Sequence, residues 1–364
     1  MNILKDPFPP YAKVAFFAVA VISVSYILQQ GSAIIVPILF STLLAILLNP
    51  IVNFLNRKRV PRPISIGIVI TIAMALVAGL VFFLVTQISL FSNMLPALKA
   101  QLIAISQQTI QWISTQFNIP INKLEEWFNK TLNDGIVDAT SIIGQTIVGV
   151  SSTVLVIFLI PVYIFMILYY KPLIMDFISK LFTKEKHHNI EVILFDTKSM
   201  IQRYLVGLLI ESIIVSGLNV IGLSIIGVKF AILLGVIGGI LNIIPYIGGV
   251  VAVILPMTIA LATQSVHASL WVLVAYIIVQ FIDNNMIMPY IVASKVKINA
   301  LASIIVVLIG SAIWGVSGMF LSIPLTAIVK VIFDRIESMK PYGFLLGDSM
   351  PNKRNYFSKK QPYL

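Results

Sequence analysis

The sequence of 364 residues contains no cysteine, and charged residues make up only 11% of it. The absence of cysteine excludes disulfide bonds and thiolate-ligated metal sites. The scarcity of charge says more, because soluble domains contain roughly a quarter charged residues. Together with 59% hydrophobic residues, it indicates an integral membrane protein.

Motifs of common enzyme chemistry are also missing. The pattern Gly-x-x-x-x-Gly-Lys-Ser/Thr does not occur, which argues against a pump that binds ATP through this chain. Two of the three histidines, His187 and His188, are adjacent and would point in different directions on a helix, which is poor metal geometry. We therefore expect no enzymatic activity, no metal and no cofactor.

Long apolar runs recur along the chain. A helical span needs about 20 apolar residues, and these runs do not alternate in polarity as the strands of a membrane barrel do. We therefore predict an all-α, polytopic membrane protein with about eight transmembrane helices, at least one of them broken. The expected spans are 14–30, 33–55, 64–86, 146–170, 205–227, 230–262, 268–290 and 298–333.

The net charge of +11 fits membrane orientation better than nucleic-acid binding. If the N-terminus is cytoplasmic and the spans alternate, the loop from Arg57 to Arg62, the connector 171–203 and the tail fall on the cytoplasmic side with most of the 25 basic residues. This agrees with the positive-inside rule. We expect a bacterial inner-membrane protein with both termini cytoplasmic, in contact with lipid and not with nucleic acid.

The order of segments divides the chain into four parts. Residues 1–86 hold three spans, and residues 87–145 form a less apolar external region with apolar residues at helical spacing. Residues 146–335 form the C-terminal membrane transport core, which includes the connector 171–203, and residues 336–364 form a basic cytoplasmic tail. The external region is expected to consist of amphipathic helices that lie in the interface or cover the spans.

The apolar stretch from Ile240 to Met257 contains residues that break helices. Pro245 removes a backbone donor and clashes with the preceding turn, while Gly248 and Gly249 permit a bend. In a membrane such a break is tolerated where protein or a water-lined cavity supplies partners. A site for substrate or ion at discontinuous helices explains it, and a packing kink is the alternative.

Asn242 and Tyr246 lie four residues apart at this break and complete the candidate site lining. The run 230–262 is too long for one straight span. We favour a single broken span over a re-entrant hairpin, because a hairpin would invert the chain after it and move the basic tail away from the cytoplasm.

Polar residues in the neighbouring spans extend the candidate pathway. Gln280, Asp283 and Asn284 fall at i, i+3 and i+4 and give one helix a polar face. Asn219 on the preceding span is a further candidate for this path. For Asp283 the alternative is a capping or interfacial role beside Asn284 and Asn285.

Glu211 and Asp283 are carboxylates within apolar runs. Such residues are rare in membranes and usually serve transport or have a partner. Both are candidates for proton or ion coupling. For Glu211 the alternative is an ion pair with Arg203 or Lys198 at the membrane interface.

The last predicted span also contains residues that can break a helix. Gly310, Gly315 and Gly318, with Pro324 beyond them, allow tight helix contact or a second discontinuity. Two broken segments, 240–257 and 310–324, are what a transport core with paired discontinuous helices shows.

In these motifs the chain resembles the autoinducer-2 exporter family of bacterial membrane proteins, which includes the PerM-type permeases. The resemblance is carried by Arg203-Tyr204-x-x-Gly207, by Asn-Ile-Ile-Pro-Tyr-Ile-Gly at 242–248, by the segment 280–289, and by the glycines and Ile-Pro pair of the last span. It implies an inner-membrane protein of about eight spans that exports small hydrophilic molecules. Other members are assigned cation/proton antiport.

The chain departs from the family pattern at polar positions. Leu208 stands where the family usually has glutamine, Asp283-Asn284-Asn285 where it often has Glu-Asn, and Asn299-Ala300 where a His-Pro turn is common. Because these changes touch polar positions, the identity of the substrate transfers least well.

Three functions are compatible with the sequence. The first is a secondary transporter that exports a small hydrophilic solute, such as the signalling molecule autoinducer-2. The second is a Na+/H+ type antiporter that uses Glu211 and Asp283. The third is an oligomeric membrane scaffold without coupled transport, and glycine-bearing helix faces are compatible with a homo-oligomer.

Overall fold

The computed structural model describes residues 9–92, 95–117, 121–122, 158–180, 187–245, 248–293 and 298–348. Within these ranges the structure is helical without strands, and a single bridge joins Ile298 to Gly347. The prediction of an all-α chain is therefore confirmed. Residues 93–94, 118–120 and 123–145 of the predicted external region, Tyr246 and the tail after Asp348 lie outside the described residues.

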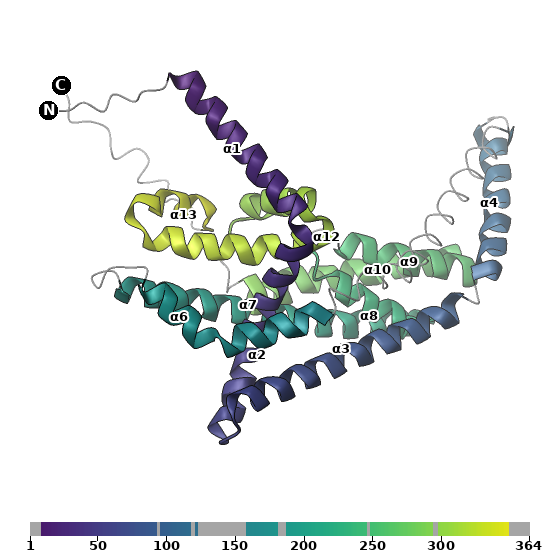
Figure 1. Cartoon of the computed structure of the whole chain (residues 1–364). Coiled ribbons are helices and arrows are strands. Elements are labelled where there is room, and N and C mark those ends of the chain that lie inside the picture. The colour runs from purple at the N-terminus through teal and green to yellow at the C-terminus, as the bar shows by residue number, and fades with distance from the viewer. Residues whose placement is uncertain are drawn as a thin grey trace. The chain divides into compact units, whose positions relative to one another are not determined.

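The described helices follow one another along the whole chain (Figure 1). They are α1 (Pro10–Gln30), α2 (Ser32–Arg57), α3 (Arg62–Ser92), α4 (Leu95–Phe117), a helix over Phe158–Tyr169, α6 (Lys171–Lys180), α7 (His187–Ile226), α8 (Ala231–Leu241), α9 (Gly248–Thr263), α10 (Val266–Ile282), the π-helices η2 (Asp283–Ile287) and η3 (Pro289–Ala293), α12 (Ala300–Arg335), the 3-10 helix η4 (Glu337–Met339) and α13 (Lys340–Leu346).

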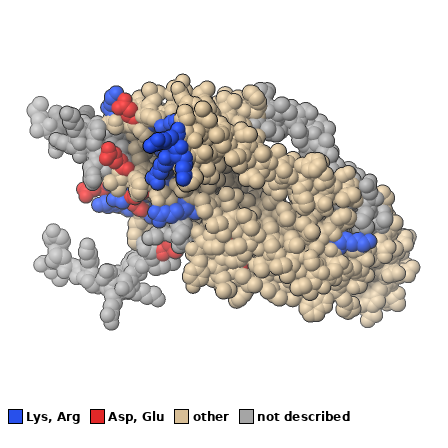
Figure 2. All heavy atoms as spheres, turned by 90° about the horizontal axis from the view of Figure 1, so that it is seen from below, with Lys and Arg blue, Asp and Glu red and all other residues tan. Residues whose placement is uncertain are grey.

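By length and composition alone, six of the described helices could cross a membrane, with α12 counted as one helix, and the bent pair of Phe158–Tyr169 with α6 would make a seventh. The chain is thus a multi-pass membrane protein, but the predicted count of eight spans is not confirmed. Figure 2 shows one face on which most of the charged side chains gather together, one basic side chain lies apart from them, and a wide area carries no charge. Such an area suits contact with lipid.

The first two predicted spans do not turn back on each other. The Gly31 amide donates to the Ile27 carbonyl at 2.8 Å, and the Ile35 amide donates to the Gly31 carbonyl at 2.9 Å. Because these bonds have the i to i−4 spacing of a helix on both sides of Gly31, α1 leads directly into α2. The expected reversal between residues 30 and 33 is therefore absent.

The chain forms two compact units. The first comprises Met1–Ile46, Tyr170–Ile201 and Val296–Leu364, and the second comprises Leu47–Tyr169 and Gln202–Lys295. The division into four parts made from the sequence concerns the sides of a membrane, and it stays a prediction.

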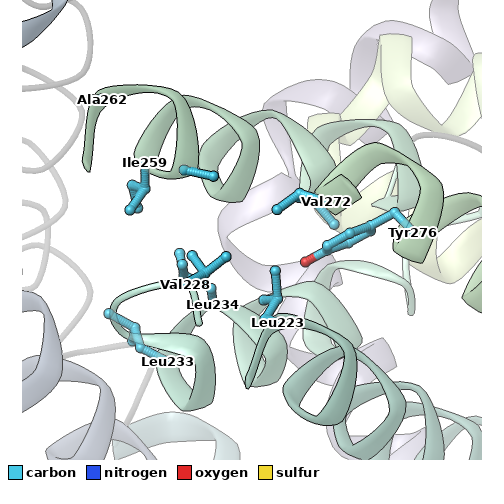
Figure 3. Packing of buried hydrophobic residues seen from close by; sticks show 10 residues of the cluster. Leu223, Val228, Leu233, Leu234, Ile259, Ala262, Val272 and Tyr276 are labelled. Carbon is cyan, nitrogen blue, oxygen red and sulfur yellow. The ribbon is translucent and has the colours of Figure 1, made fainter. Parts of the chain in front are cut away.

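In the second unit, α8 and α9 form an antiparallel helical hairpin. The Gln264 side-chain amide donates to the Gly227 carbonyl at 2.6 Å and closes its base. Further along, Leu233 and Leu234 of α8 share an apolar cluster with Ile259 of α9 (Figure 3). From the base towards the tip, the contacts join residues that are progressively closer in sequence, as a chain reversal requires.

The single broken span that we favoured over 230–262 is therefore wrong, because its two arms pack against each other as a hairpin. At 1.5 Å per residue, the 11 residues of α8 and the 16 of α9 are roughly 16 and 24 Å long, against about 30 Å for a bilayer core. Charge in the distant tail was the only basis for the wrong choice, and it does not constrain packing between the two arms.

In the first unit, α12 also reverses. Trp314 and Gly315 leave the helical conformation, and Gly315 has a φ of 58° and a ψ of −137°. A Cβ atom on Gly310 would overlap the Gly318 carbonyl, and one on Gly318 would overlap the Gly310 carbonyl. Residues eight apart in a continuous helix are separated by about 12 Å, so the two arms of α12 pack side by side. The predicted second discontinuity is confirmed, but as a reversal rather than within one straight span over 298–333.

The C-terminal part of the first unit is fastened to the start of α12. Asn299 accepts a hydrogen bond from the Ala302 amide at 2.8 Å as the N-cap of α12, and its side-chain amide donates to the carbonyls of Leu345 and Gly347 at 2.7 and 3.1 Å. At the other end of α12, Arg335 pairs with Asp196 of α7 at 2.5 Å. The predicted connector and the end of α12 are thus joined.

Candidate functional site

Asn242 joins two buried carboxylates in the second unit. It lies at the C-terminal end of α8, at the tip of the α8–α9 hairpin. Its side-chain amide donates to Asp283 Oδ2 at 2.8 Å and, over a longer distance of 3.4 Å, to Glu211 Oε1. Glu211 of α7 and Asp283 of η2 are only 5% and 2% exposed. We call Glu211, Asn242 and Asp283 the carboxylate cluster.

Glycines in α8 bring the hairpin tip to Glu211. A Cβ atom on Gly239 would overlap the Ser216 hydroxyl, and one on Gly235 would lie 2.6 Å from the Val220 backbone nitrogen. The Ser212 hydroxyl donates to the Gly239 carbonyl at 2.9 Å. This bond fixes the position of α8 along the axis of α7. Small residues thus allow the backbones to approach, as in other helix pairs in membranes.

Gln280 supports the cluster from α10. Its side-chain amide donates to Asp283 Oδ2 at 3.5 Å and to Asn284 Oδ1 at 3.2 Å. The predicted polar face at i, i+3 and i+4 is therefore present. The side-chain oxygen Oε1 of Gln280 occupies the place where a side chain on Gly249 would lie. The start of α9 therefore fits against α10 because residue 249 is a glycine.

The helix changes type at the cluster. The α-helical pattern of α10 ends at Ile282 and the π-helix η2 begins at Asp283. An extra residue in a helical turn is uncommon and often marks a functional site. The sequence analysis did not predict this change from α-helix to π-helix.

Two oxygens of the cluster have no assigned hydrogen-bond donor. Glu211 Oε2 and Asp283 Oδ1 are buried and have no hydrogen-bond partner within the described part of the chain. Buried polar atoms without a partner are rare because they have lost their water. The pair can accept hydrogen bonds from a solute, take up a proton, or contact a cation. The described residues contain no group of three or more His, Cys, Asp or Glu side chains suited to a metal.

Other predicted residues hold the helices around the cluster. Tyr204 is 4% exposed, and a Cβ atom on Gly207 would lie 2.7 Å from the Ile291 carbonyl oxygen of η3. The Arg203-Tyr204-x-x-Gly207 motif thus packs the start of this part of α7 against η3. Asn242 donates a hydrogen bond to Glu211, and the ion pair of Glu211 with Arg203 or Lys198 stays an untested alternative.

The remaining candidates divide between the units. Pro245 lies at the hairpin tip, where a Cβ atom on Gly248 would overlap the Leu241 carbonyl. Asn219 is buried on α7 but lies two turns beyond Glu211 and does not join the cluster. The last candidates belong to α12 in the first unit: Gly310, Gly315, Gly318 and Pro324.

Two polar residues near the site were not predicted. Ser212 directly follows Glu211 and bonds to α8. Tyr276 is buried on α10, one turn before Gln280, so extending the predicted polar face by one step of four would have identified it.

Comparison of the sequence with known proteins gives a consistent result. A family model described as AI-2E family transporter matches residues 14–338. The chain is 27% identical over 319 residues to the putative transport protein YrrI of Bacillus subtilis strain 168, covering 84% of this chain and 88% of that protein. Two Escherichia coli K12 proteins are similar: the putative transport protein YhhT, 25% identical over 334 residues with 90% and 92% covered, and the AI-2 transport protein TqsA, 24% identical over 324 residues with 88% and 91% covered.

Proposed function

Because the chain belongs to the AI-2E transporter family, we propose that it is a secondary transporter that exports a small hydrophilic solute across the bacterial inner membrane. The observation that carries this proposal is the meeting of Glu211 and Asp283 at Asn242, on the tip of a hairpin. One relative is named an AI-2 transport protein, so autoinducer-2 is the first solute to test.

The hairpin tip offers a way to couple binding to movement. The carbonyls of Ile240 and Leu241 accept from the amides of Ile243 and Ile244, so the turn itself pairs much of the tip backbone. In transporters, such discontinuities between helices lie at solute sites. A solute that donates only to Glu211 Oε2 and Asp283 Oδ1 leaves the bonds of Asn242 in place. A solute that replaces the Asn242 amide at Glu211 Oε1 and Asp283 Oδ2 releases the tip from α7 and η2.

A second function, cation/proton exchange, is supported by the two buried carboxylate oxygens without partners, Glu211 Oε2 and Asp283 Oδ1. A cation and a proton would then occupy the carboxylate cluster in turn. This proposal differs from solute export because Na+ and H+ would exchange when no solute is present.

Efflux from proteoliposomes tests both proposals. Vesicles loaded with autoinducer-2 should lose it faster with the wild-type protein than without protein. Because a hydrogen bond to a charged group contributes about 1.5 to 3 kcal/mol, Glu211→Gln and Asp283→Asn should slow efflux roughly tenfold to a hundredfold. Ser269→Ala is the matched control, since it removes a hydrogen bond to the Met257 carbonyl elsewhere in the second unit.

Efflux that is unchanged in both carboxylate variants would contradict a pathway through the cluster. For ion exchange, a pH-sensitive dye is enclosed without solute and a Na+ gradient is imposed. A pH change that disappears in Asp283→Asn supports the antiporter, and a pH trace equal to that of empty vesicles contradicts it.

We further propose that the connector and the C-terminal tail are cytoplasmic, as their basic charge favours. The ion pair between Asp196 and Arg335 supports placing both on one side. The other partners that we propose are the lipid bilayer and further copies of this chain in a homo-oligomer. Light scattering of the purified protein measures the mass of the assembly, and a monomeric mass would contradict the homo-oligomer.

A further inference from the structure

Two more buried polar atoms lie in the second unit away from the carboxylate cluster. Asn219 is 3% exposed and Tyr276 is 7% exposed. Asn219 Oδ1 and the Tyr276 hydroxyl have no hydrogen-bond partner among the residues that the structure describes. Neither atom is used in the proposed function, and leaving both unsatisfied is unfavourable.

Gly238 of α8 brings the two side chains together. A Cβ atom on Gly238 would lie 2.9 Å from Asn219 Nδ2 and 3.1 Å from the Tyr276 hydroxyl. Figure 3 shows the Tyr276 ring within the apolar cluster, with its hydroxyl oxygen directed away from α10 and into the cluster. The two polar groups therefore converge on a stretch of α8 backbone that has no side chain.

The segments α7, α8 and α10–η2 form both the carboxylate cluster and the place where Asn219 and Tyr276 meet at Gly238. Asn219 follows Glu211 by eight residues on α7, and Tyr276 precedes Asp283 by seven on the α10–η2 segment. These spacings correspond to about two helical turns. Between the two places, α7 contributes the hydroxyls of Ser212 and Ser216 beside Gly239, so polar groups continue from one to the other.

We propose that Asn219 and Tyr276 form a second binding station on the solute path, which holds one uncharged hydroxyl oxygen, from a passing solute or from water. A hydroxyl group both donates and accepts hydrogen bonds, so it can bond to the Tyr276 hydroxyl and to the Asn219 amide, whose Nδ2 atom is the one beside Gly238 and whose Oδ1 atom lacks a partner. The station is built from neutral side chains, unlike the carboxylate cluster. The inference depends on the proposed function, because the path it extends begins at that cluster.

Cysteine labelling tests access to the station. The chain has no cysteine, so a single Asn219→Cys variant of the full chain in proteoliposomes gives no background reaction. Leu223→Cys is the matched control, one turn further along α7 and 1% exposed. Since thiol reactivity requires access, Asn219→Cys should react with a small hydrophilic methanethiosulfonate about ten times faster than the control. Equal rates would overturn the station.

A third variant separates this inference from the proposed function. Ser212→Cys reports access at the level of the carboxylate cluster. If Ser212→Cys reacts but Asn219→Cys does not, the station is overturned and the path through the cluster stands. If neither reacts, both are overturned.

Added autoinducer-2 distinguishes the source of the hydroxyl oxygen. Slower labelling of Asn219→Cys in its presence supports occupation by the solute, and unchanged fast labelling supports occupation by water. The Tyr276→Phe variant removes only the hydroxyl. Loss of one neutral hydrogen bond should slow autoinducer-2 efflux about three- to tenfold without changing the melting temperature much. Wild-type efflux in this variant would overturn the role of the Tyr276 hydroxyl.

Discussion

The α8–α9 hairpin of the second unit and the α12 hairpin of the first contain similar kinds of residues, but their tips differ. Both are apolar, contain several glycines and include a proline. At the tip of the first, Asn242 bonds to two buried carboxylates. Near the tip of the second, the Trp314 indole donates to the backbone carbonyl of Leu28 at 2.8 Å. Glycines are enough for a reversal, and polar side chains make one of the tips a candidate site.

The packing that both hairpins share gives the largest expected effect. In Gly248→Ala the new methyl group would overlap the Leu241 carbonyl, and in Gly318→Ala it would overlap the Gly310 carbonyl. Backbone must move in both, so each substitution should cost about 2 to 3 kcal/mol or more. Thermal unfolding in detergent measures this. Gly217→Ala is the control, because nothing lies within 4 Å of its Cβ position, and equal melting of Gly318→Ala and Gly217→Ala would contradict the reversal in α12.

The polar tip gives the second effect and separates the hairpins. Asn242→Ala removes the amide that both carboxylates share, so we expect a loss of about 1.5 to 3 kcal/mol together with loss of transport. Asn242→Asp should be more harmful, because it adds a third carboxylate to a buried place. Melting curves and efflux rates check the order, and an Asp variant more stable than the Ala variant would contradict it.

The backbone of the second tip gives a smaller effect. Gly315 has a positive φ of 58° with a ψ of −137°, a region that suits glycine, and nothing lies within 4 Å of its Cβ position. Gly315→Ala should therefore destabilise the protein by about 1 to 2 kcal/mol through strain alone. Transport per folded molecule should stay near that of the wild type. A melting temperature equal to that of Gly67→Ala, a helical glycine with open space, would contradict the strain.

The smallest effect is expected for Trp314→Phe. The substitution removes a neutral hydrogen bond to Leu28, which contributes about 1 kcal/mol. Because no solute site is proposed at this tip, efflux of autoinducer-2 should persist. If Trp314→Phe lost transport as fully as Asn242→Ala, the functional difference between the two hairpins would be wrong.

Much of the site was predicted from local sequence. Polar residues in an apolar run cost free energy on insertion, which predicted a role for Asn242, Gln280, Asp283 and Asn284. Helical spacing placed the last three on one face. What the sequence did not predict is that Asn242 bonds to both carboxylates at once. That contact depends on how α8 lies against α7, which Gly239 and Ser212 set through packing between segments 27 residues apart.

Chain direction was predicted least well. Apolar length and breaking residues at 242–249 indicated a discontinuity, but the same residues suit a kink, a broken span or a hairpin. The contacts between Gly227 and Gln264 and between Gly310 and Gly318 decide in favour of reversal. Reversal also leaves fewer straight spans than the eight expected from hydropathy.

The sequence by itself determined that this is a helical membrane protein of a transporter family. Composition, apolar run length and local motifs are properties of short segments, so they can be read without knowing how the segments pack. Only the tertiary structure decided that two apolar segments fold back on themselves and that Glu211, Asn242 and Asp283 meet. The physical reason is that close approach between helices depends on which glycine faces which neighbour. That pairing is a property of the packed chain and not of any one segment.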